Sequence, residues 1–330
     1  MNELPMPKLP MEELRREATL GNVGVEVERD IPLIDLADFD ARRSEIADQL
    51  WAAATEIGFF QIVNHGLSSA EIEQAFVLAK AFFALPQTVK AQYPLLPGSN
   101  AGWEFMAQVR PSTGTPDNKE SYQITLPKMA GLWPSDQEVA GFQATMLEFE
   151  RRNWLLGMQV LSCFALKLGF DPNFFTTAHD RTSAQYQSTL RLIHYMSMEN
   201  AKPADFDLWR AGAHTDFDCL TLLHQLPGQG GLQLCPGSEA GSDRWTSVEP
   251  VEGVITCNIG DMLMRWSDDR LKSTLHRVRM PRPGGYLGSR QSLVFFCQAN
   301  KDAKIAGPEG KYAPISADDY LQQRIAANFR

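Results

Sequence analysis

The sequence predicts an α+β fold dominated by β-structure, in which a double-sheet jelly roll or barrel is supported by α-helices. From Ser188 onward the chain consists of short apolar segments separated by turns rich in Gly, Pro and Asp. Many short strands at regular spacing are typical of sandwiches and barrels rather than of a parallel sheet. Helical periodicity is concentrated before this region, so we expect the helices to pack outside the sheets.

Length and composition permit one large core. The chain has 330 residues, of which 44% are hydrophobic and 22% charged, as in ordinary globular proteins. We expect residues 1–185 to form a region of helices and strands that packs on the core. Residues 186–330 are expected to form the jelly-roll core itself, as one structural unit.

Charge and hydropathy argue against several classes of function. The net charge of −9 does not favour binding to nucleic acid or to an anionic membrane. No apolar run approaches the roughly 20 residues that cross a bilayer, and the N-terminus lacks the apolar segment of a secretory signal. The five cysteines are scattered, mostly inside apolar segments, as expected for buried thiols in a reducing compartment. We therefore expect a cytoplasmic protein, either a monomer or a weak homo-oligomer.

The elements of the first half follow from apolar spacing and from turn and capping residues. Apolar residues at helical spacing predict helices, runs of β-branched and aromatic residues predict strands, and Ser or Gly marks where helices begin or end. In order, we expect a short helix around Met11–Thr19, a strand in Ile31–Phe39, a helix over Glu45–Ile57, a strand from Phe59 to the turn at Asn64–Gly66, a helix from Ser68 or Ser69 to Pro86, a loop over Pro94–Asp117 and a long helix over Asp136–Leu168.

The second half is expected to contain short strands bounded by Gly, Pro and Asp turns. The expected strands include Leu190–Met198, Leu220–Leu223, Gly231–Leu234, Trp245–Val248, Val254–Ile259, Met262–Trp266, Leu275–Arg279 and Gln291–Cys297.

The segment HTD places a histidine and an aspartate two residues apart, at His214 and Asp216. On an extended strand, both side chains leave from the same face. An imidazole and a carboxylate on one face supply two of the three ligands of a facial triad, which suits non-haem Fe(II). The pattern alone is weak, because chance pairs of this kind are common. A third ligand from a distant strand is required.

Among the other histidines, His276 is the best candidate for that ligand. It lies in the strand-like segment LHRVRM, far enough along the chain for several strands to return it beside His214. His65 is expected to hold a turn by hydrogen bonds, and His194 to be a satisfied core histidine. His224 is expected to be structural, and His179 to lie on the surface. Asp218, in the same segment as His214, is expected to be a turn or outer-face residue.

The segment GSRQSLVFF predicts an anion site. Arg290 and Ser292 share one face of an otherwise apolar strand. A buried arginine needs an anionic partner, and the guanidinium fork is suited to a carboxylate. Tyr195 lies on the same face of its own strand as Arg191 and could donate to the same anion. The alternatives are a surface salt bridge for Arg290 and a core ring with a satisfied hydroxyl for Tyr195.

Several of these segments, in this order and spacing, resemble the isopenicillin N synthase-like Fe(II)/2-oxoglutarate-dependent oxygenases over nearly the whole chain. The matching segments are IPLIDLADF, GFFQIVNHGL, DNKESYQI, LWP, AGAHTDFDCLTLL, GGLQL, NIGDMLMRWSDDRLKSTLHRV and RQSLVFF. Plant members usually have Asn two residues before the tyrosine that corresponds to Tyr195, and Ile193 departs from that pattern. The segment LRLIHY is more similar to microbial members, including pyrimidine 7-hydroxylase-like enzymes.

The resemblance implies a double-stranded β-helix with helices supporting one side. It implies that His214, Asp216 and His276 bind Fe(II), and that the remaining site residues, Arg290, Ser292 and Tyr195, bind 2-oxoglutarate. The implied reaction uses O2 to oxidise, most simply to hydroxylate, a C–H bond of a small organic molecule, and it releases succinate and CO2.

The substrate pocket is expected to contain Arg191 and Phe296, from face alternation, and Phe217, from its position beside Asp216. Plain filling of the barrel is the alternative for the two phenylalanines. An inward Arg191 would favour a substrate that carries a carboxylate, phenolate or carbonyl group. The polar, Gly-rich loop Pro97–Thr115 is either a lid over the pocket or an ordinary surface loop.

Two other functions are compatible with these motifs. One is an Fe(II) oxidase of the same fold that does not use 2-oxoglutarate, such as isopenicillin N synthase or aminocyclopropane-carboxylate oxidase. These enzymes use the Arg-x-Ser pair on the substrate's own carboxylate. The other is a non-catalytic metal-binding jelly roll, although structural metal sites are usually closed by protein ligands.

Overall fold

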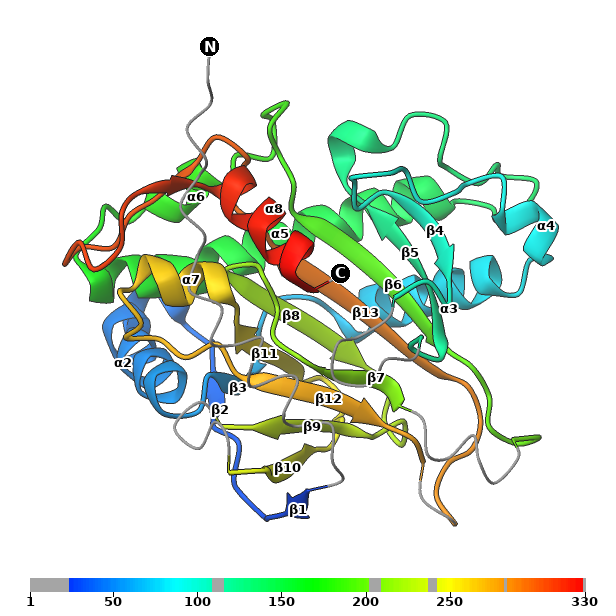
Figure 1. Ribbon diagram of the computed structural model, residues 1–330, viewed down its shortest axis with the longest axis horizontal. Helices are drawn as coiled ribbons and strands as arrows, with labels where there is room; N and C mark the ends of the chain where they lie inside the picture. The colour runs from blue at the N-terminus through cyan, green and yellow to red at the C-terminus, as the bar shows by residue number, and fades with distance from the viewer. Residues whose placement is uncertain (1–23, 109–115, 202–208, 237–241, 282–283, 329–330) are drawn as a thin grey trace.

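The computed structural model describes residues 24–108, 116–201, 209–236, 242–281 and 284–328 (Figure 1). Two large sheets face each other, and the long helices cover the outer face of the larger one. The expected α+β class with helices outside the sheets is confirmed. The helix expected around Met11–Thr19 lies outside the described residues.

The larger sheet has eight strands, drawn from both halves of the chain. In spatial order they are β2 (Leu33–Asp35), β3 (Phe59–Val63), β11 (Ile255–Ile259), β8 (Leu220–Gln225), β13 (Arg290–Cys297), β6 (Thr189–Tyr195), β5 (Lys119–Ile124) and β4 (Gly102–Phe105). Because strands from both sides of residue 185 join one sheet, the two regions share hydrogen-bonded structure. A boundary at that residue stays a prediction.

The smaller sheet has five strands, and two of them carry His214 and His276. In spatial order they are β1 (Val25–Glu26), β10 (Arg244–Val248), β9 (Leu232–Cys235), β12 (Leu275–Arg279) and β7 (Trp209–His214). Neighbouring strands are antiparallel in both sheets except for the pairs β1–β10 and β2–β3, which are parallel. A short pair, β14 (Lys304–Ile305) and β15 (Ile315–Ser316), stands apart.

Two helix termini have the capping residues expected from the sequence. Ser68 and Glu71 form a capping box at the start of one helix, and Gly169 ends another in the left-handed conformation, as expected. The helices are α2 (Phe39–Glu56), α3 (Ser69–Phe83), α4 (Gln87–Lys90), α5 (Phe142–Leu168), α6 (Phe174–Ala178), α7 (Asp261–Trp266) and α8 (Ala317–Asn328), with a 3₁₀ turn at Leu126–Lys128.

Two apolar layers fix which side chains face the space between the sheets. On β6, Leu190 and Leu192 pack into the core beneath the helices, whereas Ile193 and Tyr195 join a second core between the sheets. On β13 the residues alternate in the same way. The face that carries Arg191 and Tyr195 therefore points between the sheets, as the period of two requires.

Two sequence-based assignments of secondary structure were wrong. Met262–Trp266 was expected to be a strand but forms helix α7, because a short apolar run cannot distinguish a strand from a buried helix by periodicity. The expected loop Pro94–Asp117 contains strand β4, which pairs with β5. Strand β5 was itself missed, because its charged and polar residues do not alternate with apolar ones, yet all of them are buried.

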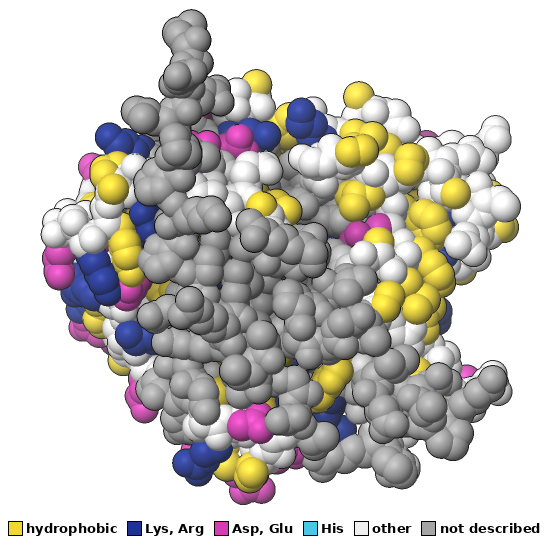
Figure 2. Space-filling model, in the orientation of Figure 1, with side chains coloured by type: hydrophobic (Ala, Val, Ile, Leu, Met, Phe, Trp, Pro, Cys, Tyr) yellow, Lys and Arg dark blue, Asp and Glu magenta, His cyan; other side chains and the backbone are white. Residues whose placement is uncertain are grey.

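Hydrophobic and charged side chains are unevenly distributed over the face of the molecule in Figure 2. Hydrophobic side chains gather around β4 and β5, whereas acidic and basic side chains are interspersed at the opposite edge. Phe105 and Met106, at the end of β4, are among the exposed large hydrophobic residues.

Candidate metal centre and anion site

His214, Asp216 and His276 converge between the two sheets. His276 on β12 lies opposite His214 on the neighbouring strand β7, and their ring centroids are 4.3 Å apart. Oδ1 of Asp216 lies 3.9 Å from Nε2 of His214 and 3.7 Å from Nε2 of His276. One ligand atom from each residue lies within 4.8 Å of the others. Nitrogen and oxygen ligands bind transition metals at about 2.0–2.2 Å, so an ion between these atoms would require little rearrangement.

The expected geometry of the HTD segment was wrong in one respect. Strand β7 ends at His214, and β8 begins at Leu220, so Asp216 lies in an irregular turn rather than on a strand. The aspartate reaches the histidines because the chain turns back at this point, and not because alternate side chains share a strand face.

Backbone carbonyls orient both imidazoles. Nδ1 of His214 lies 2.7 Å from the carbonyl oxygen of Gly212, and Nδ1 of His276 lies 3.1 Å from that of Thr274. A carbonyl accepts only, so each Nδ1 carries the proton and donates. The lone pair of each Nε2 is left to face the site, which is the usual arrangement around a ligating histidine.

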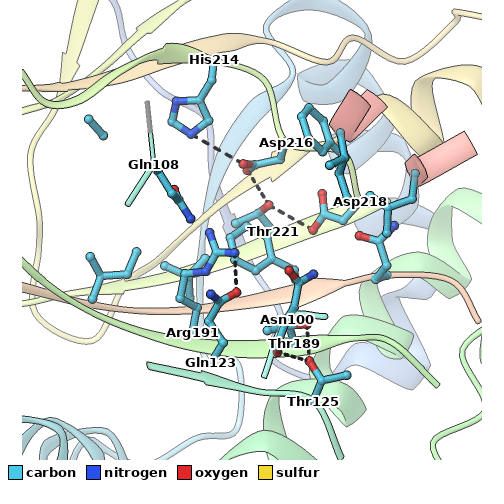
Figure 3. Close-up of a pocket in the computed structure, with 18 of the residues that line it drawn as sticks. Asn100, Gln108, Gln123, Thr125, Thr189, Arg191, His214, Asp216, Asp218 and Thr221 are labelled. Carbon is cyan, nitrogen blue, oxygen red and sulfur yellow. Dashed lines mark hydrogen bonds and ion pairs between the residues drawn. The ribbon is translucent and has the colours of Figure 1, made fainter. Parts of the chain in front are cut away.

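Two polar side chains orient the carboxylate of Asp216. Its Oδ2 accepts a hydrogen bond from Thr221 Oγ1 (2.7 Å), and its carboxylate faces His214 (Figure 3). Oδ2 also accepts from Asn258 Nδ2 (2.9 Å), while Oδ1 faces both histidines. Thr221 and Asn258 are directly opposite each other on β8 and β11. Neither residue was predicted from the sequence. The available signal was a buried polar residue among apolar neighbours on each strand.

Asp218 lies in the turn between β7 and β8, which is one of its two expected positions, but the other, on the outer face, was wrong. Its side chain is buried and lines the cavity beside the triad, with Oδ2 at 3.1 Å from Thr221 Oγ1 (Figure 3). Burial, and then the neighbouring charge of Asp216, raise the pKa of Asp218 well above its usual value. A Cβ at Gly260 would lie 2.2 Å from the backbone oxygen of Asp218, so glycine is required there.

Arg290 forms a buried cationic site on β13. Its Nη1 donates to Ser292 Oγ (2.7 Å), its Nε donates to the carbonyl of Gln229 (2.9 Å), and its guanidinium carbon lies 4.8 Å from the ring centroid of Tyr195. Burial lowers the pKa of Arg290, but a guanidinium keeps its charge in proteins. No carboxylate of the described residues pairs with Arg290. A buried, uncompensated cation of this kind is suited to an anionic ligand.

One cavity of about 500 Å³ joins the triad to this cation. It is lined by all three expected substrate residues, Arg191, Phe217 and Phe296. Nη2 of Arg191 donates to Gln123 Oε1 (2.7 Å) (Figure 3). The guanidinium carbon of Arg191 lies 5.0 Å from the ring centroid of Phe296. Gln123 was missed because strand β5 was not predicted.

The loop Pro97–Thr115, expected to be either a lid or an ordinary surface loop, lies only partly within the described residues. Gly98, Asn100 and Gln108 line the cavity, and residues 109–115 lie outside the described residues. Trp103 is buried and donates to Glu120 Oε2 (2.8 Å). The role of this loop as a lid stays a prediction.

Three of the remaining histidines have the expected structural roles. Nε2 of His224 lies 2.7 Å from Asn153 Oδ1, Nδ1 of His65 accepts from the N–H of Leu67 at 3.3 Å, and His194 is bonded to Glu120, although His194 is partly exposed. All five cysteines are buried and free, as expected.

The surface position expected for His179 was wrong. It is fully buried between α6 and β13, with Nδ1 2.7 Å from the carbonyl oxygen of Phe175 and Nε2 3.3 Å from that of Cys297. Burial lowers the pKa of His179 to about 4. The adjacent Asp180 suggested a loop, whereas the apolar residues of α6 bury this helix end.

Comparison with known proteins connects this site to a family. Residues 31–140 match the family model described as non-haem dioxygenase in morphine synthesis N-terminal, and residues 186–299 match the 2OG-Fe(II) oxygenase superfamily. A proline hydroxylase of Petromyces alliaceus, buaE, is 30% identical over 92% of this chain and 100% of its own. The chain belongs to the 2OG-Fe(II) oxygenase superfamily. A 2-oxoglutarate-Fe(II) type oxidoreductase of Emericella nidulans, hxnY, is 31% identical over 88% of both chains.

Solved structures agree with this assignment. The crystal structure of a full-length Neurospora crassa protein in complex with alpha-KG and thymine matches with a TM-score of 0.79 and 30% identity, over 91% of this chain and 98% of that chain. The rice dioxygenase for auxin oxidation, at 22% identity and a TM-score of 0.68, shares the fold over 90% of this chain and 95% of its own.

This oxygenase is a 2-oxoglutarate-dependent non-haem iron dioxygenase that uses Fe(II), 2-oxoglutarate and O2 and acts on small molecules. The resemblance to the isopenicillin N synthase-like family is confirmed. Among the described residues, no helix is long and apolar enough to span a membrane.

Proposed function

We propose that this oxygenase hydroxylates a C–H bond of a small polar molecule, on a double-stranded β-helix formed by its two facing sheets. In this proposal His214, Asp216 and His276 hold Fe(II), and Arg290, Ser292 and Tyr195 hold 2-oxoglutarate. The observation that carries the proposal is one cavity with three convergent ligand atoms and a buried arginine that lacks a protein carboxylate among the described residues.

The donor set fits Fe(II). Two neutral imidazoles and one carboxylate form the 2-His-1-carboxylate triad that leaves open positions on iron, and the Nδ1 and Oδ2 atoms are already bonded elsewhere. Iron with bound 2-oxoglutarate and O2 supplies the oxidation, in which 2-oxoglutarate becomes succinate and CO2 and the substrate gains an oxygen atom. The protein residues hold the reactants in place and limit access of water to the cavity.

The anion site fits the carboxylate of 2-oxoglutarate that does not reach the metal. Arg290 presents its remaining donors beside the Ser292 hydroxyl, and Tyr195 lies directly across the strand pair. A guanidinium and a hydroxyl on one face can bind a carboxylate through charge-assisted hydrogen bonds. Because the site is buried, these bonds are stronger than they would be in water.

Arg191 is proposed to select the substrate. It lies in the cavity, is held by Gln123 and stacks on Phe296, so it can orient a carboxylate, phenolate or carbonyl group. Phe217, beside Asp216, is proposed to pack against the apolar part of the substrate. The complex of the N. crassa protein with thymine supports a small molecule with carbonyl groups.

Stoichiometry tests the proposal. Anaerobically purified enzyme with Fe(II) is given 2-oxoglutarate, O2 and a panel of small carbonyl and carboxylate compounds, and succinate and oxidised product are counted. We expect one succinate for each product, and no product with His276→Ala. Product formed without 2-oxoglutarate would instead identify an oxidase of the isopenicillin N synthase type.

We further propose that the protein works in the cytoplasm as a monomer or weak homo-oligomer, independently of nucleic acid. Its five buried free thiols support a reducing compartment. Sedimentation velocity at several protein concentrations tests the oligomeric state.

A further inference from the structure

The last helix, α8, contacts the metal-binding turn through one buried arginine. Arg324 is 2% exposed and forms an ion pair with Asp261, the first residue of α7. Its Nη2 also donates to Thr215 Oγ1 (3.3 Å), and its guanidinium carbon lies 5.2 Å from the ring centroid of Phe217. Arg324 therefore contacts the residues immediately before and after Asp216.

Asp261 holds the same turn from another direction. Its backbone N–H donates to the carbonyl oxygen of Asp216 (2.8 Å), and its Oδ2 accepts from Thr215 Oγ1 (3.1 Å). Its side chain is 1% exposed, and a buried carboxylate is costly without a cation beside it. Arg324 supplies that cation, so the position of Asp261 depends on Arg324.

The turn needs such support because it lies between strands. His214 is the last residue of β7, and His276 lies within β12, so ladder hydrogen bonds place both histidines. Asp216 lies in the irregular segment before β8 begins at Leu220. Side-chain contacts therefore determine where the carboxylate lies.

We propose that Arg324 is a positioning residue for iron binding: together with Asp261 it fixes the Thr215–Phe217 turn so that Oδ1 of Asp216 faces the two histidines. The inference rests on the proposed role of Asp216 as an iron ligand. Leu321 and Ile325 of the same helix line the cavity, so α8 both closes the cavity and holds the turn.

Metal affinity is the readout that separates positioning from general stability. Arg324→Met keeps the length of the side chain and removes its charge, Asp261→Asn removes the partner charge, and Arg324→Lys is the conservative variant. The dissociation constant of Fe(II) is measured anaerobically, with Mn(II) as a redox-stable probe. We expect Arg324→Met to weaken binding by about 10- to 100-fold, as for other residues that orient metal ligands, and Arg324→Lys to recover part of the loss.

The double variant tests whether the two residues act together. Because both belong to one network, Arg324→Met with Asp261→Asn should weaken binding about as much as the stronger single variant, rather than by the product of the two effects. In the metal-free protein, Arg324→Met should also speed hydrogen exchange at the amide of Asp261, which donates to Asp216.

Arg265→Met is the matched control. Arg265, on α7, lies over the ring of Tyr320 on α8 and over that of Tyr312, and it donates to the carbonyl of Ala313, so it joins α7 to α8 and to the segment before α8 without contacting the turn. This variant should lower the melting temperature and leave the metal dissociation constant unchanged. If Arg324→Met bound the metal with wild-type affinity, or if Arg265→Met weakened metal binding equally, the role of Arg324 would be overturned and the proposed function would stand. Wild-type protein that binds neither metal would overturn the proposed function first.

Discussion

Thr221 and Asn258 face each other on adjacent antiparallel strands, and both donate to the same oxygen of Asp216. Oδ2 lies 2.7 Å from Thr221 Oγ1 and 2.9 Å from Asn258 Nδ2, and Oδ1 is left to face the histidines. The orientation of the carboxylate is therefore set by the register of β8 and β11, which places these two donors side by side.

Asn258→Leu should weaken Fe(II) binding by about 10- to 100-fold, because residues that orient metal ligands have effects of this size. The substitution keeps the approximate volume of the side chain and removes the donor to Oδ2. The measurement is an anaerobic Fe(II) titration. Thr256→Val is the matched control, because Thr256 lies on the same strand and bonds to Gln61 instead. Equal affinity in wild type and Asn258→Leu would contradict the role of Asn258.

Arg290→Met should raise the KM for 2-oxoglutarate by about 10- to 100-fold, which corresponds to the loss of a hydrogen-bonded charge. Fe(II) affinity without 2-oxoglutarate should be unchanged, because Arg290 does not contact the triad. The matched control is Arg181→Met, since Arg181 pairs with buried Glu150 outside the cavity. An unchanged KM in Arg290→Met would place the carboxylate elsewhere.

The candidate ligands could be predicted from sequence because iron chemistry restricts their residue types. His214, Asp216 and His276 were selected by chemistry and by order along the chain, even though the strand assumed for Asp216 ends at His214. Arg290 and Tyr195 followed from the period of two on long strands, which does not depend on where the strand pairs. Each of these predictions depends on the residues of a single segment and not on how distant segments pair.

The features that were not predicted from the sequence depend on pairing between distant segments. Thr221 and Asn258 acquire a role only through the register of β8 and β11, and register is not visible in a single strand. The same is true of Arg324, whose partner Asp261 lies on another helix. The burial of Asp218 was not predicted, because strand alternation does not apply beyond the end of β7.

Arg191→Met should raise the KM for the substrate by about 10- to 100-fold, because a charged hydrogen bond to the substrate is lost. The KM for 2-oxoglutarate should be unchanged, and more succinate should form per product as the substrate is held less well. The matched control is His194→Gln, on the opposite face of β6 and bonded to Glu120. If the substrate KM were the same in Arg191→Met and wild type, Arg191 would have no part in substrate binding.

His179 makes the fold sensitive to acid. Its folded-state pKa is lowered to about 4 by burial, whereas a histidine in the unfolded chain titrates near 6.5. Between these values the unfolded state binds more protons, so stability is fully present above the unfolded pKa and falls as the pH drops toward about 4. At pH 5 this histidine should cost about 2 kcal/mol of unfolding free energy relative to pH 7.5.

His179→Gln removes the titrating group and keeps an amide that can donate to the carbonyl of Phe175. Urea unfolding at pH 7.5 and pH 5 should show that the variant loses about 2 kcal/mol less than wild type between the two pH values. The comparison uses the difference between pH values, so an equal loss of stability at both does not affect it. His65→Gln is the control, because His65 is less deeply buried and burial lowers its folded-state pKa less. If wild type and His179→Gln lost the same stability on acidification, the buried imidazole would not be the acid-sensitive group.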